Sequence, residues 1–493
     1  MDKIKNIKLE YIHIAVIILG IIFISLSIFH SNLWFDESYS VALASHSFAE
    51  IWKIGGNDVH PILYYMCLHI LNLIFGNNVV VYRIFSCIPI AFLGILGFTH
   101  IRKDFGKRVG FLFSIFSYFL PFCSMYSGEI RMYSLGLLLG TIMAIYAYRI
   151  YKNNINKTTF MFFGISSLAV SYTHYYGLMF AGIVNLLLLI FLIKNIKTRK
   201  QDLIKFVVTA IIQVICYLPG LICFLTQLKN VSKGFWITLS FPQTFYEILT
   251  VQFDGNFINM PIVLTTAIYA YLVFLIFKTK KEERKPGTWA IGIYVSIIII
   301  VLFISICMKS VILLNRYLII VTGLIIFAIS YFIAKDTNKY RIISVCIICI
   351  LLSCFSNFSL IKENYNTKNK ECINFIEEKI QKDDIILYSN AINGAVITAL
   401  NSFNNENISY FYNKEHWGVE EAYKAYAPYM EIKNSLEEIL ENYKGRIWLI
   451  ESENTNTLFN EIAEKYTVTK IEEREFYQPY KNYSYTIELI EKF

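Results

Sequence analysis

Long apolar runs separated by short polar stretches recur along this chain of 493 residues. A run of about 18 or more apolar residues can cross a hydrocarbon layer of about 30 Å as a helix. A helix also satisfies its own backbone polar groups, which lipid cannot do. The pattern therefore predicts about eleven transmembrane helices. They cover residues 12–29, 79–101, 109–126, 131–150, 159–173, 177–194, 204–226, 260–278, 288–308, 313–334 and 341–361.

One further apolar segment, HPILYYMCLHILNLIFG at residues 60–76, is not counted as a span. Its length is marginal, and His60, His69 and Asn72 would be unusual among lipid chains. Counting it would also move the basic cluster RKDFGKR to the other side of the membrane. We therefore expect an interfacial helix in the first outer loop.

The pattern changes after residue 361, where polar residues become frequent. DIILYS (384–389) and RIWLIES (446–452) are typical of short strands, and SLEEILENY (435–443) and TLFNEIAEKY (457–466) are typical of helices. The chain is thus expected to have a transmembrane domain at 1–361 and a small α/β domain at 362–493.

Composition agrees with a membrane protein, since 56% of the residues are hydrophobic, 17% are charged and the mean hydropathy is +0.48. The net charge of +8 comes from short basic clusters between the spans. Such clusters mark the cytoplasmic side of a membrane protein, so no nucleic-acid partner is expected. The N-terminus should be cytoplasmic and the C-terminal domain extracytoplasmic. The clusters lie at residues 1–8, 102–108, 148–157, 194–200, 278–285 and 335–341.

Ionisable residues gather at the outer ends of the predicted spans. Five separate outer loops carry acids, arginines and histidines, and such a gathering indicates a site at the membrane surface. The residues are Asp36 and Glu37 in WFDES, His60 in the interfacial segment, Glu129 and Arg131 in GEIRMY, His174 in THYYG, and Arg316 in NRY.

Each of these residues also has a structural interpretation. Asp36 could cap the helix that follows it, and Arg131 and Arg316 could reach lipid headgroups from span ends. His174 could simply be packed between aromatic residues, and Arg83 could anchor its own helix. Glu50 is left out of the site because Ser47 and Glu50 have the spacing of a capping box.

An ordered set of motifs resembles the bacterial glycosyltransferase family 39 membrane proteins. These are relatives of protein O-mannosyltransferases and of the lipid A aminoarabinose transferase, within the GT-C superfamily. The motifs are WFDESYS, DVHPILYYMCLHILNLIFG, VVVYRIFS and SGEIRMYSLGLLL, and the resemblance covers roughly residues 10–195. Family members often have two prolines after the histidine, where this chain has HPI.

The resemblance implies a polytopic α-helical GT-C fold and sugar transfer from a polyprenyl-phosphate donor in a bacterial plasma membrane. It places the catalytic carboxylate of the first outer loop at Asp36. The outer domain resembles no family.

Chemistry from the residues agrees with this expectation. A phosphate leaves as a stabilised anion when cationic donors face it, and Arg131 and Arg316 could supply them. An attacking hydroxyl needs a carboxylate to accept its proton, a role for Asp36 with Glu37 beside it, and in-line attack would invert the anomeric carbon. The expected substrate-binding residues are His60, Tyr64, Tyr65, Arg83, Glu129, Arg131, Tyr133, His174 and Arg316.

Several alternatives stay open from the sequence. Asp36, Glu37, Glu129 and His60 could hold a divalent cation, although no ligand spacing requires one. The chain could be a transporter or flippase, although such proteins carry ionisable residues near span centres. It could also be a non-catalytic scaffold. The acceptor could be a protein, a glycan or a lipid.

Overall fold

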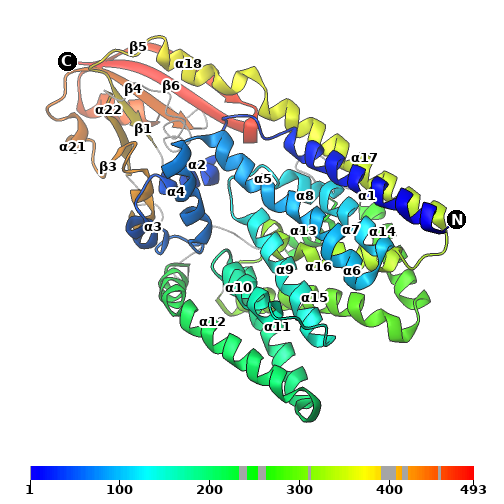
Figure 1. The fold of residues 1–493 in the computed structure, drawn as a ribbon. Helices are drawn as coiled ribbons and strands as arrows, with labels where there is room; N and C mark the ends of the chain where they lie inside the picture. The colour runs from blue at the N-terminus through cyan, green and yellow to red at the C-terminus, as the bar shows by residue number, and fades with distance from the viewer. Residues whose placement is uncertain are drawn as a thin grey trace. The chain divides into compact units, whose positions relative to one another are not determined.

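The computed structural model describes residues 2–231, 241–253, 262–308, 312–389, 407–413, 420–452 and 457–493 (Figure 1). The chain divides into two compact units, which we call the first and second units. The first unit contains residues 1–28, 59–64 and 83–360, and the second contains 29–58, 65–82 and 361–493. The segment from residue 361 onward thus forms one unit with residues 29–58 and 65–82. The expected domain boundary between residues 361 and 362 stays a prediction.

The first unit consists of helices that run through most of the chain. Its first half contains α1 (Asp2–Ser25), α5 (Val79–Leu96, with its first turn in the second unit), a π-helical turn η1 (Gly97–Ile101), α6 (Arg102–Phe105), α7 (Lys107–Phe119), α8 (Pro121–Met125), α9 (Tyr133–Tyr151), α10 (Thr159–Ser171) and α11 (Tyr175–Lys194). Its second half contains α12 (Ile196–Val231, kinked at Arg199), α13 (Phe241–Thr250), α14 (Ile262–Lys278), α15 (Lys281–Met308), the 3-10 helix η2 (Asn315–Val321), α16 (Thr322–Ile333) and α17 (Lys339–Asn364).

Seven helical segments among the described residues are long and apolar enough to cross a membrane, which confirms a polytopic α-helical membrane protein. They are Val79–Phe105, Tyr133–Tyr151, Tyr175–Lys194, Ile196–Lys229, Lys281–Met308, Asn315–Ile333 and Lys339–Glu377. Four shorter apolar helices accompany them, at Leu9–Ser25, Leu63–Phe75, Thr159–Ser171 and Thr265–Lys278. Helices therefore overlap all the predicted spans, although residues 260–261 lie outside the described residues.

One predicted span, at residues 109–126, is interrupted in the structure. Helix α7 ends at Phe119, and α8 begins at Pro121. Proline has no backbone N–H and disfavours helical geometry at the residue before it, and Leu120 accordingly has an extended backbone with ψ of 128°. The break leads the chain into the loop that carries Glu129 and Arg131.

Close packing of α9 against η2 and α16 positions much of the candidate site. A Cβ atom built on Gly323 would lie 2.0 Å from Oγ1 of Thr141, and one built on Gly140 would lie 3.0 Å from the backbone oxygen of Ile320. Glycine therefore allows these backbones to approach closely. As a result, Arg316 and Tyr317 of η2 are held near the start of α9.

The second unit contains a six-stranded sheet of order β3-β2-β1-β4-β6-β5, which confirms the predicted α/β domain (Figure 1). Strand β1 is parallel to β2 and β4, β2 is parallel to β3, and β6 is antiparallel to β4 and β5. The strands are β1 (Ile385–Tyr388), β2 (Ser409–Tyr412), β3 (Glu431–Lys433), β4 (Gly445–Ser452), β5 (Val468–Gln478) and β6 (Tyr483–Lys492).

Short helices complete the second unit. The helices before the sheet are α2 (Phe35–Ala44), α3 (Phe48–Gly55) and α4 (Leu63–Phe75, with its first two residues in the first unit). The sheet is accompanied by α18 (Glu371–Glu377), α20 (Glu420–Tyr423), α21 (Glu437–Leu440) and α22 (Thr457–Lys465). There are also three 3-10 turns, η3 (Thr367–Lys370), η4 (Lys424–Tyr426) and η5 (Tyr480–Asn482). The predicted helix at 435–443 is only the single turn α21, because Tyr443 folds back and its hydroxyl contacts the backbone oxygens of Asp383 and Arg446.

Helix α4 is the short apolar helix predicted for residues 60–76. Two of the polar residues that argued against a span, His69 and Asn72, are hydrogen-bonded within the second unit, whereas His60 lies in the first unit. Nδ1 of His69 lies 2.9 Å from the backbone oxygen of Ala44, and the Asn72 amide donates to the same oxygen at 3.3 Å. The predicted capping box of Ser47 and Glu50 is also present at the start of α3.

Candidate functional site

The two acids of WFDES lie in the first turn of α2, in the second unit. The N-cap residue is Trp34, so Asp36 does not cap this helix. Negative charge in a first turn interacts favourably with the positive end of the helix dipole. Asp36 is half-buried, whereas Glu37 is buried and accepts hydrogen bonds from the Tyr480 hydroxyl at 2.8 Å and the Trp34 backbone N–H at 3.4 Å.

Tyrosines from the C-terminal segment surround α2. The backbone N–H of Phe35 donates to the hydroxyl of Tyr483 at 3.0 Å. The rings of Tyr39 and Tyr426 lie 6.0 Å apart, and those of Tyr39 and the predicted site residue Tyr65 lie 5.9 Å apart. Burial and the nearby charges of Asp36 and Glu37 raise the pKa of Tyr483 to about 12, so this phenol stays protonated.

The sequence analysis did not identify these C-terminal tyrosines. They lie in a segment that resembles no family, and Tyr480 is 443 residues from its partner Glu37. Their only signal in the sequence is the density of tyrosine in YQPYKNYSY. Contacts over such a separation cannot be inferred from local pattern.

A loop between α8 and α9 carries the next set of predicted residues, in the first unit. Arg83 is buried, and its Nη1 donates to the backbone oxygen of Gly128 at 2.7 Å. The backbone N–H of Arg131 donates to the backbone oxygen of Glu129 at 2.7 Å, which tightens the turn. The side chains of Glu129 and Arg131 are both buried. Arg83 therefore holds the loop that presents Glu129 and Arg131, and its contact with substrate stays a prediction.

Four predicted or neighbouring residues form what we call the histidine–tyrosine cluster: His60, Tyr133, His174 and Tyr317. Ring centroids of His60 and His174 are 5.4 Å apart, and Tyr317 lies 5.6 Å from His60 and 4.7 Å from His174. Tyr133 lies 6.3 Å from both His174 and Tyr317. The structure thus brings together residues from four parts of the sequence. Tyr317, which follows Arg316 directly, was not among the predicted site residues.

Two arginines face this cluster. Burial lowers the pKa of His174 to about 3, and the positive charges of Arg131 and Arg316 lower it further in the same direction. Burial, Arg131, His174 and Arg316 also hold the pKa of His60 well below its usual value. Both imidazoles are therefore neutral at pH 7, and the positive charge of the site comes from Arg131 and Arg316.

A cavity of about 180 Å³ adjoins the histidine–tyrosine cluster. His60, His174 and Tyr317 line one part of it, and apolar side chains such as those of Phe224, Ile304 and Met308 line the rest. Nε2 of His174 is buried and has no hydrogen-bond partner among the described residues. An unpaired buried polar atom is costly, so this nitrogen is available to a polar ligand group.

Tyr64 lies in a different environment from the cluster. Its hydroxyl shares a hydrogen bond of 2.6 Å with the hydroxyl of Ser86 on α5, and its side chain is buried. The structure therefore gives Tyr64 a packing contact, and a role in substrate binding stays a prediction. Among the described residues, no group of three or more His, Cys, Asp or Glu side chains could hold a metal ion.

Comparisons with known proteins identify the fold. No protein-family model and no curated protein sequence matches the chain. Among solved structures, a crystal structure of ArnT from Cupriavidus metallidurans bound to undecaprenyl phosphate matches with a TM-score of 0.60 and 10% sequence identity, over 97% of each chain. The chain therefore has the GT-C fold of polytopic membrane proteins, as the resemblance implied.

Two oligosaccharyltransferase structures from Archaeoglobus fulgidus are more distant. The first, in complex with Zn and sulfate, has a TM-score of 0.46 and 10% identity, and covers 89% of this chain and 68% of its own. The second, AglB with an inhibitory peptide and a dolichol-phosphate, has a TM-score of 0.43 and 10% identity, and covers 96% of this chain and 74% of its own.

Proposed function

We propose that this protein is a membrane glycosyltransferase that transfers a sugar from a polyprenyl-phosphate donor to an extracytoplasmic acceptor. The observation that carries the proposal is the placement of Arg131 and Arg316 around two buried neutral histidines, beside a largely apolar cavity. A lipid phosphate has the matching character, because it joins an anion to an apolar chain. The ArnT structure with the same fold was obtained with undecaprenyl phosphate bound.

Charge stabilisation explains how the arginines act. When the sugar leaves its carrier, negative charge grows on the phosphate oxygen, and cations held in a buried site stabilise that charge strongly. A guanidinium can engage two phosphate oxygens at once. The neutral imidazoles add hydrogen-bonding groups without adding charge that would repel the arginines.

Asp36 is the proposed base that accepts the proton of the acceptor hydroxyl, and Glu37 supports the same helix turn. Attack opposite the departing phosphate inverts the anomeric carbon. In this proposal the N-terminus is cytoplasmic and the second unit is extracytoplasmic, in the plasma membrane of a bacterium, where the acceptor is a protein, a glycan or a lipid. His60, Glu129, Tyr133 and His174 of the first unit, and Tyr65 of the second unit, are the other residues that we propose for substrate binding.

Transfer assays on arginine variants test the proposal. Purified protein is given a radiolabelled polyprenyl-phosphate sugar, and donor binding and single-turnover release of the sugar are measured. Arg131→Ala and Arg316→Ala should lower the rate by about 100-fold or more, and the Lys variants should recover only part because they lose the planar fork. Arg108→Ala is the matched control, since Arg108 is exposed and lies in the first turn of α7, outside the cluster.

Full activity of both Lys variants, with Ala variants that only express poorly, would show that these arginines anchor lipid headgroups. If neither the variants nor the wild-type chain release sugar from any of several donors, sugar transfer is rejected. Transport of a lipid-linked substrate is then the function to test.

A further inference from the structure

A cavity of about 480 Å³ lies in the first unit and shares no lining residue with the candidate site. Helices α6, α9, α11, α15 and α16 enclose it. The lining includes the buried residues Thr141, Val184 and Gly323, whose part of the cavity we call its deep end. It also includes exposed lysines at the basic ends of the helices, whose part we call its mouth. No part of the proposed reaction uses this cavity.

The dimensions of the cavity fit one leaflet of a bilayer. Thr141 at its deep end and Tyr151 at its mouth are ten residues apart on α9, which corresponds to about 15 Å along a helix. Half of a hydrocarbon core of about 30 Å has the same depth. The wall between these levels is apolar and aromatic, with Tyr148, Phe327 and Tyr331. Trp289 at the mouth is 51% exposed, as interfacial tryptophans are.

The mouth carries an excess of one positive charge when Arg149, which pairs with Asp104 but does not line the cavity, is counted with the three acids and three lysines of the lining. The carboxylate of Asp104 is paired with Arg149 at 2.8 Å, and that of Glu283 is paired with Lys335 at 2.5 Å. Lys152 and Lys285 line the mouth, are exposed, and form no ion pair with the described residues. Glu282 supplies the single remaining acid of the lining. The mouth is therefore complementary to an anionic headgroup, which lysines bind as point charges.

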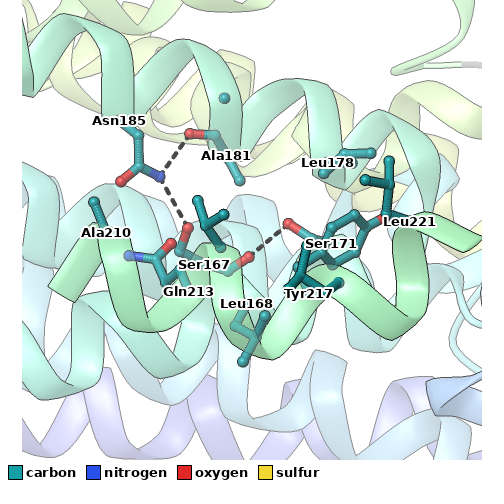
Figure 2. Close-up of a pocket in the computed structure, with 13 residues that line it drawn as sticks. Ser167, Leu168, Ser171, Leu178, Ala181, Asn185, Ala210, Gln213, Tyr217 and Leu221 are labelled. Carbon is teal, nitrogen blue, oxygen red and sulfur yellow. Dashed lines mark hydrogen bonds between the residues drawn. The ribbon is translucent and has the colours of Figure 1, made fainter.

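A second cavity of the same unit provides a contrast (Figure 2). It has about 280 Å³ and lies between α10, α11 and α12, with Ser167, Asn185 and Gln213 among its lining residues. No Lys, Arg, Asp or Glu lines it. Charge complementarity therefore distinguishes the larger cavity from this one.

We propose that the 480 Å³ cavity binds one anionic phospholipid from the leaflet at the basic ends of the helices. An acyl chain fills the aromatic-walled interior, and the phosphate lies between Lys152 and Lys285. This site is independent of sugar transfer. The bound lipid fills the cavity and makes van der Waals contacts with α9, α15 and α16 that an empty cavity would lack.

Native mass spectrometry of the full chain tests this site. The delipidated protein is titrated in detergent with phosphatidylglycerol or with phosphatidylcholine. The wild-type chain should retain one phosphatidylglycerol at concentrations where phosphatidylcholine is not retained. Lys152→Glu/Lys285→Glu should weaken this binding by about ten-fold or more, and Ala144→Phe, which places a ring in the cavity, should also reduce it.

The matched control is Lys157→Glu/Lys200→Glu, which reverses two exposed basic residues that do not line the cavity. It should bind phosphatidylglycerol as the wild-type chain does. The proposal would be overturned if the wild-type chain retained the two lipids equally. It would also be overturned if the control and mouth variants lost phosphatidylglycerol binding to the same extent. Lys152→Gln/Lys285→Gln, which adds no repulsion, keeps the test decisive if the Glu variants do not fold.

Discussion

Buried histidines beside arginines give the candidate site its charge pattern. A protonated imidazole at His60 or His174 would add a third positive charge to a buried group that already contains Arg131 and Arg316. Both histidines therefore stay neutral at physiological pH. This arrangement leaves the two guanidinium groups as the cations that the proposed donor phosphate would meet, and we expect it to make the folded protein sensitive to acid.

Stability should fall as the pH falls from about 6.5 toward about 3. The pKa of His174 is about 3 in the folded protein and near the ordinary value of 6.5 in the unfolded chain, so the unfolded chain binds more protons in this window. The stabilisation is complete above pH 6.5 and is lost progressively below it. Thermal unfolding in detergent across this range measures the slope, and His174→Gln should reduce it. An unchanged slope in the double variant His60→Gln/His174→Gln would show that other groups cause the acid sensitivity.

Asp36→Asn should abolish transfer while leaving the protein folded and able to bind donor. Asn preserves the shape of the side chain but cannot accept the proton, so the rate should fall by about 10²–10⁴-fold. Single-turnover rates and donor binding are measured side by side. Glu37→Gln is the comparison, and its effect should be smaller because Gln can still accept the hydrogen bond from Tyr480. Near-normal turnover of Asp36→Asn would leave Asp36 as a first-turn charge worth about 0.3–1 kcal/mol.

At the scale of elements, helix α2 depends on the segment around η5 and β6. The Tyr480 hydroxyl donates to Glu37, and the Phe35 backbone donates to Tyr483. These contacts fix the first turn, where Asp36 lies. The C-terminal segment therefore acts as a support for the proposed base, in addition to any role of its own.

Tyr480→Phe should lower the turnover rate more than it changes donor binding. The change removes a buried hydrogen bond to a charged group, which contributes about 1.5–3 kcal/mol, and it loosens the turn that orients Asp36. Separate measurement of kcat and KM tests this expectation. Tyr477→Phe is the matched control, because Tyr477 is 49% exposed and its hydroxyl, among the residues that the structure describes, binds Asn482 of the same hairpin. If both variants turn over equally well, the support of α2 does not depend on Tyr480.

Elements defined by local pattern were predicted well from the sequence. Hydropathy located the helices that overlap the predicted spans, and short apolar runs located β1 and β4. The break at Pro121 was missed because apolar residues continue across it. His60, Arg131, His174 and Arg316 lie near one another in the first unit, and their role as a site stays a prediction. Tyr317 and Tyr480 were not identified from the sequence. Tertiary contacts decide those positions, and neither hydropathy nor spacing encodes them.

At the scale of the whole molecule, the proposal of an extracytoplasmic site depends on the orientation of the chain in the membrane. Single cysteines that replace the exposed residues Lys103 and Phe493 should be labelled from opposite sides of the membrane. They are introduced after replacement of the exposed Cys216, Cys307 and Cys354. An impermeant maleimide should label Phe493→Cys in intact cells, and Lys103→Cys only after the membrane is opened. The reverse labelling would invert the orientation and place the candidate site in the cytoplasm.

The second unit gathers residues 29–58, 65–82 and 361–493, so its two ends are made at very different times. Phe35 and Tyr483 are 448 residues apart. At a synthesis rate of about 5–20 residues per second, the helix that carries Asp36 waits roughly 20–90 s for its tyrosine partners. A ribosome that stalls before the last strand therefore leaves a chain whose membrane helices are inserted but whose acid-bearing helix is unsupported. Synthesis of the segment that carries Tyr480 and Tyr483 thus acts as a late step of assembly for the helix turn that carries Asp36.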